Sequence, residues 1–468
     1  MILIWIRLNL TGMALASTLG LGLMHATHAA DLVEVWQAAA QNDRDYAVAR
    51  ATQAAAQPRR EQAASLWRPQ VGLSGTVGLG SSQTEARGAQ FSAPGLGTST
   101  GVGFNTSVNN GSVTRWALSA VQPLYNPQRR AQQEQLALST DLAELEWGGA
   151  RQTLLVGTAQ RYFDIALAQE TLRVFEQQLT AVQRATSEAE DRFRLGSIPV
   201  TDIHEARARL AGIRSQVLAA RTDLQLKRQL LADSTGLPAA SLTARLPAAR
   251  AAVEAPRQLD LWLADADGGN PGIRMRRLAA EIAGKEAAKF RLSSSPTVDL
   301  VAQAGRDYIG GSGDFGSASN AGANRMIGVQ VSIPLFTGGW RGAKEEEARR
   351  LADKAQAEVD QTRQMVAQQV RAAWLGLSVG GERLQALVEG LSASQARRDA
   401  TELGQQVGHR TTQDLLNAEN DQAGAQLALA QARVGVLMER LRLEALAGLL
   451  DDAVLHAING ELETAAGP

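Results

Sequence analysis

The 468-residue sequence has 47 lysines and arginines against 48 aspartates and glutamates, a net charge of −1, and no cysteine. This balance argues against a nucleic-acid-binding protein, because such proteins usually carry a large positive excess. The lack of cysteine excludes disulfides, thiolate metal sites and catalytic cysteines. With 44% hydrophobic residues, the chain is too apolar to be disordered.

The first residues have the pattern of a secretory signal peptide. Arg7 is the only charged residue before Asp31, residues 8–23 are mostly apolar and small, and small residues around Ala29 offer a cleavage site. A membrane-anchoring helix is the alternative, but polar residues interrupt its short apolar core. We predict a signal peptide at residues 1–29, whose removal takes away Arg7 and leaves a net charge of −2. No other stretch has the ~20 apolar residues of a spanning helix, so membrane contact would be made by β-strands.

The two halves of the chain match in order, which indicates an internal duplication. Pro123-Leu124-Tyr125 resembles Pro334-Leu335-Phe336, and a glycine turn at residues 196–206 matches one at residues 408–418 with a constant offset of 212. The triplet and the glycine are 73 residues apart in the first half and 74 in the second. Agreement over so long an interval is hard to obtain by chance.

The duplication divides the chain into four parts after the signal peptide. We expect a first repeat at residues 30–235, with a helix, two strands, a long helix and a returning hairpin helix. A proline-bearing equatorial segment at residues 236–262 follows, and then a second repeat at residues 263–450. The C-terminal tail, residues 451–468, is expected to have little order.

Four runs alternate apolar residues with small or polar ones, which places the apolar set on one face of a strand. Each run has about 9 residues, the length that a tilted strand needs to cross a hydrocarbon layer. An ordinary half-buried sheet would show the same alternation. The apolar sets are Val71, Leu73, Val77 and Leu79; Trp116, Leu118 and Ala120; Val298, Leu300, Ala302 and Ala304; and Ile327, Val329, Val331 and Ile333.

Two further features favour a membrane sheet. Gly, Ser, Thr and Asn make up 21 of the 35 residues 80–114 and 11 of the 20 residues 305–324, which we expect to be long polar loops. Aromatic residues flank the strands on the opposite side, as in the girdle at a membrane interface. Because a small barrel takes about eight strands, several chains must contribute. The flanking aromatics are Trp67, Tyr125, Phe290, Phe336 and Trp340.

Long stretches without proline predict two long helices, at residues 128–195 and 341–407. The second would hold 67 residues and extend for about 100 Å. Apolar residues recur at three- and four-residue spacing between residues 172 and 193 and again between 203 and 224. This pattern is typical of antiparallel helices in a left-handed coiled coil. Gly196 and Gly408 therefore mark the tips of two hairpins.

Together these features resemble the TolC-like outer-membrane channel family, the outer membrane efflux proteins. The likeness covers nearly the whole mature chain and includes the opening Asp31-Leu32-Val33-Glu34-Val35-Trp36, both Pro-Leu-aromatic triplets, Thr337-Gly338-Gly339 after the last strand and both glycine turns. It implies a mainly α fold with a membrane β-barrel. It also implies that three chains form one twelve-stranded barrel in the bacterial outer membrane, and that a tunnel of long coiled-coil helices continues it across the periplasm.

The family's periplasmic gate lies in the two turns. Its second-half motif, Gly-Thr-Arg-Thr-x-x-Asp-x-x-Asp, corresponds here to residues 408–417. The resemblance implies that Arg410 is the gate arginine and Asp414 one constriction acid, with Asn417 in place of a second acid. Three Asp414 carboxylates around one axis would repel each other and raise their pKa values, while Arg410 could bridge neighbouring hairpins.

The first-half partners implied by the resemblance are Thr201 and Asp202. Gln405 stands where the best-known members carry a tyrosine, so the link from this position to Asp202 would be an amide link. A simpler interpretation remains open: Thr201 or Thr412 caps a helix, and the following aspartate favours its first turn.

No catalytic constellation stands out, so we expect neither an enzyme nor a cofactor. Gly97-Thr98-Ser99-Thr100-Gly101 fits a nucleophile-elbow pattern, and residues 311–316 fit a dinucleotide pattern, but both lie in expected loops. We attribute both matches to chance, although the first leaves a hydrolase as a remote alternative.

The resemblance also implies partners: a homotrimer, outer-membrane lipid, a periplasmic adaptor and an inner-membrane ABC or RND transporter. The adaptor would dock at the tips, at Gly196, Ser197, Gly408 and His409. Small-molecule efflux and type I secretion of polypeptides both remain open. A soluble periplasmic coiled-coil scaffold without channel activity is the alternative from another class.

Overall fold

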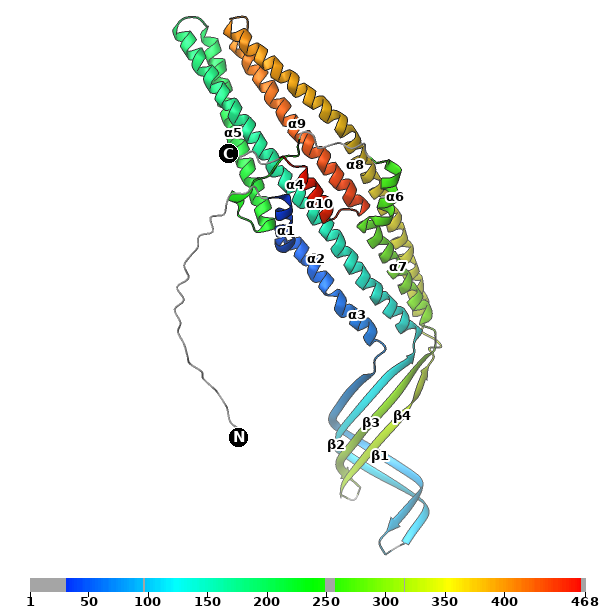
Figure 1. The fold of residues 1–468 in the computed structure, drawn as a ribbon. Coiled ribbons are helices and arrows are strands. Elements are labelled where there is room, and N and C mark those ends of the chain that lie inside the picture. The colour runs from blue at the N-terminus through cyan, green and yellow to red at the C-terminus, as the bar shows by residue number, and fades with distance from the viewer. Residues whose placement is uncertain (1–30, 96, 249–256, 315, 464–468) are drawn as a thin grey trace, which may run out of the picture.

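The computed structural model describes residues 31–463 except for residues 96, 249–256 and 315, so the predicted signal peptide lies outside the described residues. The chain is elongated (Figure 1): a bundle of helices occupies one end and a sheet the other, and two helical hairpins end at the pole far from the sheet. In the described part of the chain, no helix combines the length and apolarity needed to cross a bilayer.

The sheet contains four antiparallel strands in the order β1-β2-β3-β4. Their bounds are β1 Gln70–Ala93, β2 Gly97–Tyr125, β3 Thr297–Gly313 and β4 Gly316–Ser332. One row of partners across the sheet joins Val71, Ala120, Ala302 and Ile327. Directly opposed residues share a face, so the four predicted apolar sets form one band, and the alternation is confirmed.

The predicted loops at residues 80–114 and 305–324 are wrong, because most of these residues continue the strands. β1 and β2 stay paired as far as Ala93 and Gly97, and β3 and β4 as far as Gly313 and Gly316. Small polar residues on both faces give no period-two signal, yet they pair through the backbone as well as apolar residues do. Residues 82–93 and 97–108 pair beyond the last partners of β3, and we call this two-stranded extension the ribbon.

The two long helices are confirmed to within one residue at each end: α4 spans Pro127–Arg194 and α8 Trp340–Gln406. Proline occupies the first turn of α4, where its missing N–H has no intrahelical partner to lose, and Asn126 accepts from the Arg129 N–H at 2.9 Å. The returning helices are α5 Val200–Thr235 and α9 Thr412–Ala447.

The predicted coiled-coil seam between α4 and α5 is largely confirmed. Val182, Ile213 and Val217 are each no more than 3% exposed. The predicted stripe ends before the tip, because Phe193 is 41% exposed.

Shorter helices complete both halves in the same order: helices, two strands, a long helix and a return. They are α1 Leu32–Asn42, α2 Arg44–Ala54, α3 Ala56–Ser65, the 3-10 turn η1 Ala239–Ser241, α6 Leu259–Gly269 and α7 Pro271–Leu292. Helix α4 packs against α3, α5, α7 and α9, and α8 packs against α7 and α9. The helices next to the sheet therefore lie side by side in the order α3, α4, α7 and α8. This matches the strand order β1-β2-β3-β4, because each of these helices directly precedes or follows the corresponding strand.

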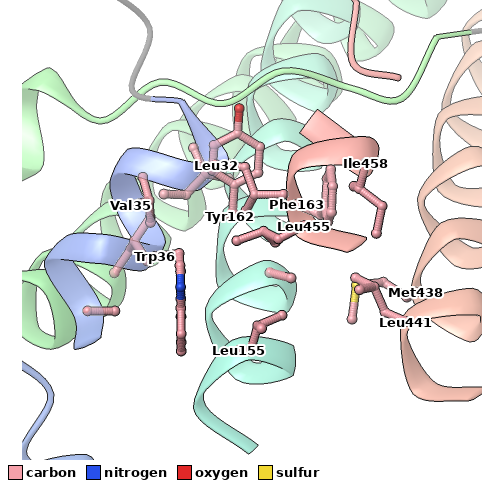
Figure 2. Packing of buried hydrophobic residues seen from close by; sticks show 14 of the residues in the cluster. Leu32, Val35, Trp36, Leu155, Tyr162, Phe163, Met438, Leu441, Leu455 and Ile458 are labelled. Atoms are coloured by element: carbon pink, nitrogen blue, oxygen red, sulfur yellow. The ribbon is translucent and has the colours of Figure 1, made fainter. Parts of the chain in front are cut away.

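The main core lies where the first and last helices of the described chain pack with α4 (Figure 2). Leu32 from the first helix and Tyr162 and Phe163 from α4 are fully buried. Leu455 and Ile458, also fully buried, come from α10, Asp452–Gly460. The expectation of a disordered tail is therefore wrong for these residues. A nine-residue helix has little stability by itself, and this one depends on tertiary contacts that a local pattern does not reveal.

Leu455→Ala is expected to destabilise the folded chain by about 2–5 kcal/mol, because it leaves a cavity in this core. His456→Ala, at an exposed position of the same helix, is the matched control and should have little effect. Thermal unfolding of both variants in detergent measures the difference. Equal midpoints for the two variants would contradict the burial of α10.

Candidate functional site at the hairpin tips

Both hairpins turn through the same backbone geometry. Gly196 and Gly408 have φ of +72° and +80°, which glycine adopts without strain. Their N–H groups donate to Phe193 O at 2.8 Å and to Gln405 O at 3.2 Å, positions that are again 212 residues apart. The Ser197 N–H donates to Arg192 O, and the His409 N–H donates to Gly404 O in the same way. The internal match thus extends to single hydrogen bonds.

The start of α9 is held by a capping box. The Asp414 N–H donates to Thr411 Oγ1 at 3.1 Å, and Asp414 Oδ2 accepts from the Thr411 N–H at 3.0 Å. The cap is therefore Thr411 and not Thr412, and the spacing Thr-x-x-Asp could have identified it. Hydrogen bonds from Thr411, helped by the charge of Arg410, hold the pKa of Asp414 below its usual value within one chain. The predicted rise concerns three carboxylates around an axis and stays a prediction.

The start of α5 differs from that of α9. Pro199 occupies the cap position and has no side-chain bond to offer, so Asp202 has no counterpart of the Thr411 contact. Thr201 Oγ1 instead donates to Asp202 Oδ1 at 3.2 Å, and both residues are exposed. Asp202 is therefore exposed beside Thr201 at the tip of the first hairpin.

The other candidate gate residues surround the second turn. Arg410 is exposed, and its side chain lies against Gly404, where an added Cβ would stand only 2.9 Å from Arg410 Cγ. Asn417 Oδ1 accepts from Gln413 Nε2 at 3.3 Å, and Gln405 is buried, with 6% of its surface exposed. Across the described part of the chain, no hydrogen bond joins Gln405 to Asp202. The expected amide link would need a movement of the hairpins or a second chain.

The two hairpins touch below their tips. Leu416, from the second turn of α9, packs in one buried cluster with Val182 of α4 and Ile213 of α5. Gln178 Nε2 donates to Asn420 Oδ1 at 3.3 Å across the same contact. A change at either tip can therefore reach the other hairpin through α9.

Sequence reasoning missed Glu419, which lies in this contact. Its Oε2 atom is buried and has no hydrogen-bond partner among the described residues. Burial raises the pKa of its carboxyl, Arg398 and Arg184 oppose the rise, and Glu402 adds to it. No local signal marks this residue, because its burial depends on tertiary packing around α9, with Arg398 and Glu402 of α8 and Arg184 of α4 nearby.

Glu419→Gln is expected to flatten the pH dependence of stability. A carboxyl whose pKa is higher in the folded chain binds more protons there than in the unfolded chain. Stability therefore falls as the pH rises from the unfolded pKa of about 4.3 through the folded value. Unfolding midpoints measured from about pH 4 to pH 8 test this, with the exposed Glu382→Gln on α8 as control. A parallel pH dependence in wild type and Glu419→Gln would contradict it.

The five predicted interface aromatics gather where the sheet meets the helices. Trp67 Nε1 donates to Gln133 Oε1 at 2.9 Å, and the rings of Phe290 and Trp340 meet edge to face at 6.1 Å. Tyr125 and Phe336 are exposed, the latter by 87%. Each stands at the end of a strand or helix at this junction, beside the apolar band.

These elements define a class of protein: a channel subunit with a strand end for the membrane and a helical end with paired tips. The sequence pattern of the outer membrane efflux proteins matches residues 35–237 and 262–449, and the chain belongs to this family.

Individual relatives agree with this. The outer membrane protein TolC of Escherichia coli is 25% identical over 449 residues, which cover 94% of this chain and 87% of the relative. The alkaline protease secretion protein AprF of Pseudomonas aeruginosa is 24% identical over 343 residues, 73% of this chain and 71% of the relative. The crystal structure of VceC of Vibrio cholerae shares the fold, with a TM-score of 0.69 and 19% identity over 89% of this chain and 96% of that one.

The protein is therefore an outer-membrane channel protein of efflux or type I secretion with a large periplasmic part, and not an enzyme. The predicted mainly helical fold with four antiparallel strands in one sheet is confirmed, as is the predicted location.

Proposed function

We propose that three copies of this chain close one twelve-stranded barrel and one helical tunnel. The observation that carries the proposal is that both lateral edges are open. Among the described residues, β1 and β4 end the sheet without a partner strand on their outer sides, and such edges normally need covering. Helices α5 and α8 also leave large apolar side chains exposed. They are Leu218, Leu226 and Leu230 on α5, and Leu351, Met365, Leu375, Val379, Val388 and Leu403 on α8.

The two faces of the sheet support the direction of closure. The apolar band is exposed to the surroundings: Leu73 is 74% and Val329 60% exposed. The opposite face carries Ser119, Arg115 and Asp307, of which the last two face each other across β2 and β3. In the proposed barrel, the apolar face meets lipid on the outside and the polar face meets water on the inside.

The tips form the closed end of the tunnel in this proposal. Asp414 and Arg410 narrow it around the axis, Asn417 lines it behind them, and Gln405, Thr201 and Asp202 hold neighbouring hairpins. A periplasmic adaptor docks at Gly196, Ser197, Gly408 and His409 and connects the channel to an inner-membrane ABC or RND transporter. The transported substrates are small molecules or secreted polypeptides.

Channel recordings in planar bilayers test this function. We expect discrete conductance steps from the purified protein, and heat-resistant trimers in the outer-membrane fraction. If the protein shows no channel activity and is absent from the outer-membrane fraction, it is the coiled-coil scaffold instead. Drug susceptibility of a deletion strain, compared with its loss of one secreted polypeptide, separates efflux from secretion.

A further inference from the structure

We propose that the ribbon is a lid that folds inward over the outer mouth of the barrel and limits the size of solutes that pass. This inference rests on the threefold barrel proposed above. It starts from the place where the ribbon leaves the sheet, because Figure 1 shows the strands β1 and β2 turning sharply near the ends of β3 and β4.

A built hinge produces this turn. Asn110, with φ of +48°, is the only non-glycine residue with positive φ in the described part of the chain. The pairing of β2 with β3 shifts register between Asn109 and Ser112, and β1 shifts against β2 between Gly80 and Ser82. Shifts of this kind bend a strand pair. Because both strands are irregular at the same level, the ribbon leaves as one unit.

Close packing fixes the angle of the hinge. A Cβ added to Gly111 would lie 2.8 Å from Ile309 Cγ1 and 3.2 Å from Val108 Cγ1, so only glycine fits between these two side chains. Val108 is 2% and Ile309 9% exposed. Most strand residues around them are exposed, so this small apolar contact is a local clamp between ribbon and sheet.

The ribbon folds over the polar face of the sheet. Ile309 and Asn320 are direct partners and belong to the face opposite the apolar band, since Tyr308 pairs with Thr114 and Thr114 with Val77. Asn320 Nδ2 donates to Thr84 Oγ1 of the ribbon at 3.4 Å. A Cβ on Gly313, on the same face, would stand 3.0 Å from Ser107 O. All these contacts lie on the face that the proposed barrel turns toward its axis.

The ribbon is long enough to cover the mouth. It has 12 residues in each strand, or about 40 Å at ~3.3 Å per residue. Twelve strands spaced by ~4.8 Å and tilted by ~40° close with a radius of about 12 Å. Three ribbons folded toward the axis would therefore overlap the opening, and their Gly, Ser and Thr side chains would leave a wet, polar passage.

Labelling of a single cysteine from outside the cell tests the lid, because the natural chain has no cysteine to interfere. Ser119→Cys places a thiol on the polar face and Leu118→Cys places one on the apolar face as the matched control. Whole cells receive either a short maleimide or a long polyethylene glycol maleimide. In the full-length chain we expect the short reagent to label the Ser119 variant and the long reagent to label it poorly.

Shortening the ribbon should then admit the long reagent. In the variant, an Asn-Gly turn replaces residues 86–104 between the paired residues Glu85 and Asn105, which keeps the hinge intact. We expect labelling by the long reagent to rise severalfold while labelling by the short reagent stays constant. Val108→Asp, which breaks the clamp without shortening the ribbon, should have the same effect and serves if the shortened chain fails to reach the membrane.

Unchanged labelling by the long reagent in both variants would overturn the lid. If the chain does not form the proposed barrel, the result is different. Either the short reagent then fails to label Ser119→Cys, or it labels Leu118→Cys equally well. These outcomes separate an error about the ribbon from an error about the proposed channel.

Discussion

Replacing Val329 with lysine should remove most of the assembled protein from the outer membrane. Val329 lies in the apolar band, opposite Leu300, and 60% of its surface is exposed. A lysine on the lipid face of a barrel costs up to about 2–4 kcal/mol, the value at the bilayer midplane, and a trimer carries it three times. The measurement is the amount of heat-resistant trimer in the outer-membrane fraction, relative to wild type.

Gln330→Lys is the matched control, because Gln330 is the next residue of the same strand and points to the polar face. It pairs with Asp299, so the new lysine faces a carboxylate across the strands. We expect near-normal assembly of this variant. Equal loss of trimer in both variants would show that the two faces are not distinguished by lipid, and the membrane orientation of the sheet would be abandoned.

Asp414→Ala and Arg410→Ser should each raise the single-channel conductance severalfold. Arg410 is exposed and Asp414 half-buried at the tip, where a charged ring and its arginine bridges favour the narrow state in the proposed trimer. Planar-bilayer recordings of the purified variants give the measurement. Since Asn417 replaces a second acid, block by multivalent cations should also be weaker than in a relative with two acidic rings.

The capping box requires a control for this result, because Asp414→Ala also removes a helix cap. Thr411→Val removes the Thr411 Oγ1 contact and leaves the carboxylate in place. If the charge closes the tip, Thr411→Val should conduct nearly as wild type does. A rise equal to that of Asp414→Ala would mean that the cap, and not the carboxylate ring, holds the tip, and unchanged conductance in all three variants would remove the gate assignment.

The parts of the fold that follow from short-range chemistry could be predicted closely. Proline and glycine are strong local signals, so the long helices end within one residue of their predicted bounds. The alternation around Leu73 and Val329 correctly predicts that the apolar residues share one face, since period two survives wherever one face is apolar. The turn at Gly408 was located by the internal match alone.

The parts that depend on distant contacts could not be predicted. Small polar residues on both faces hide the ribbon, because their pairing has no side-chain signature. Helix α10 folds only because Leu455 reaches a core built from the first and last helices of the described chain and α4. Glu419 is a polar residue in a helix, so its sequence predicts an exposed side chain, and only tertiary packing makes it half-buried. The cap is a different kind of miss: the sequence analysis expected Thr412, although the local spacing Thr-x-x-Asp is enough to identify Thr411.

Sedimentation of the purified mature chain in detergent tests threefold closure most directly. The open edges of β1 and β4 predict a single stable species of three copies that needs detergent to stay in solution. A monomer that is freely soluble in water without detergent would contradict it, because the exposed apolar band and both unpaired strand edges would then have no partner.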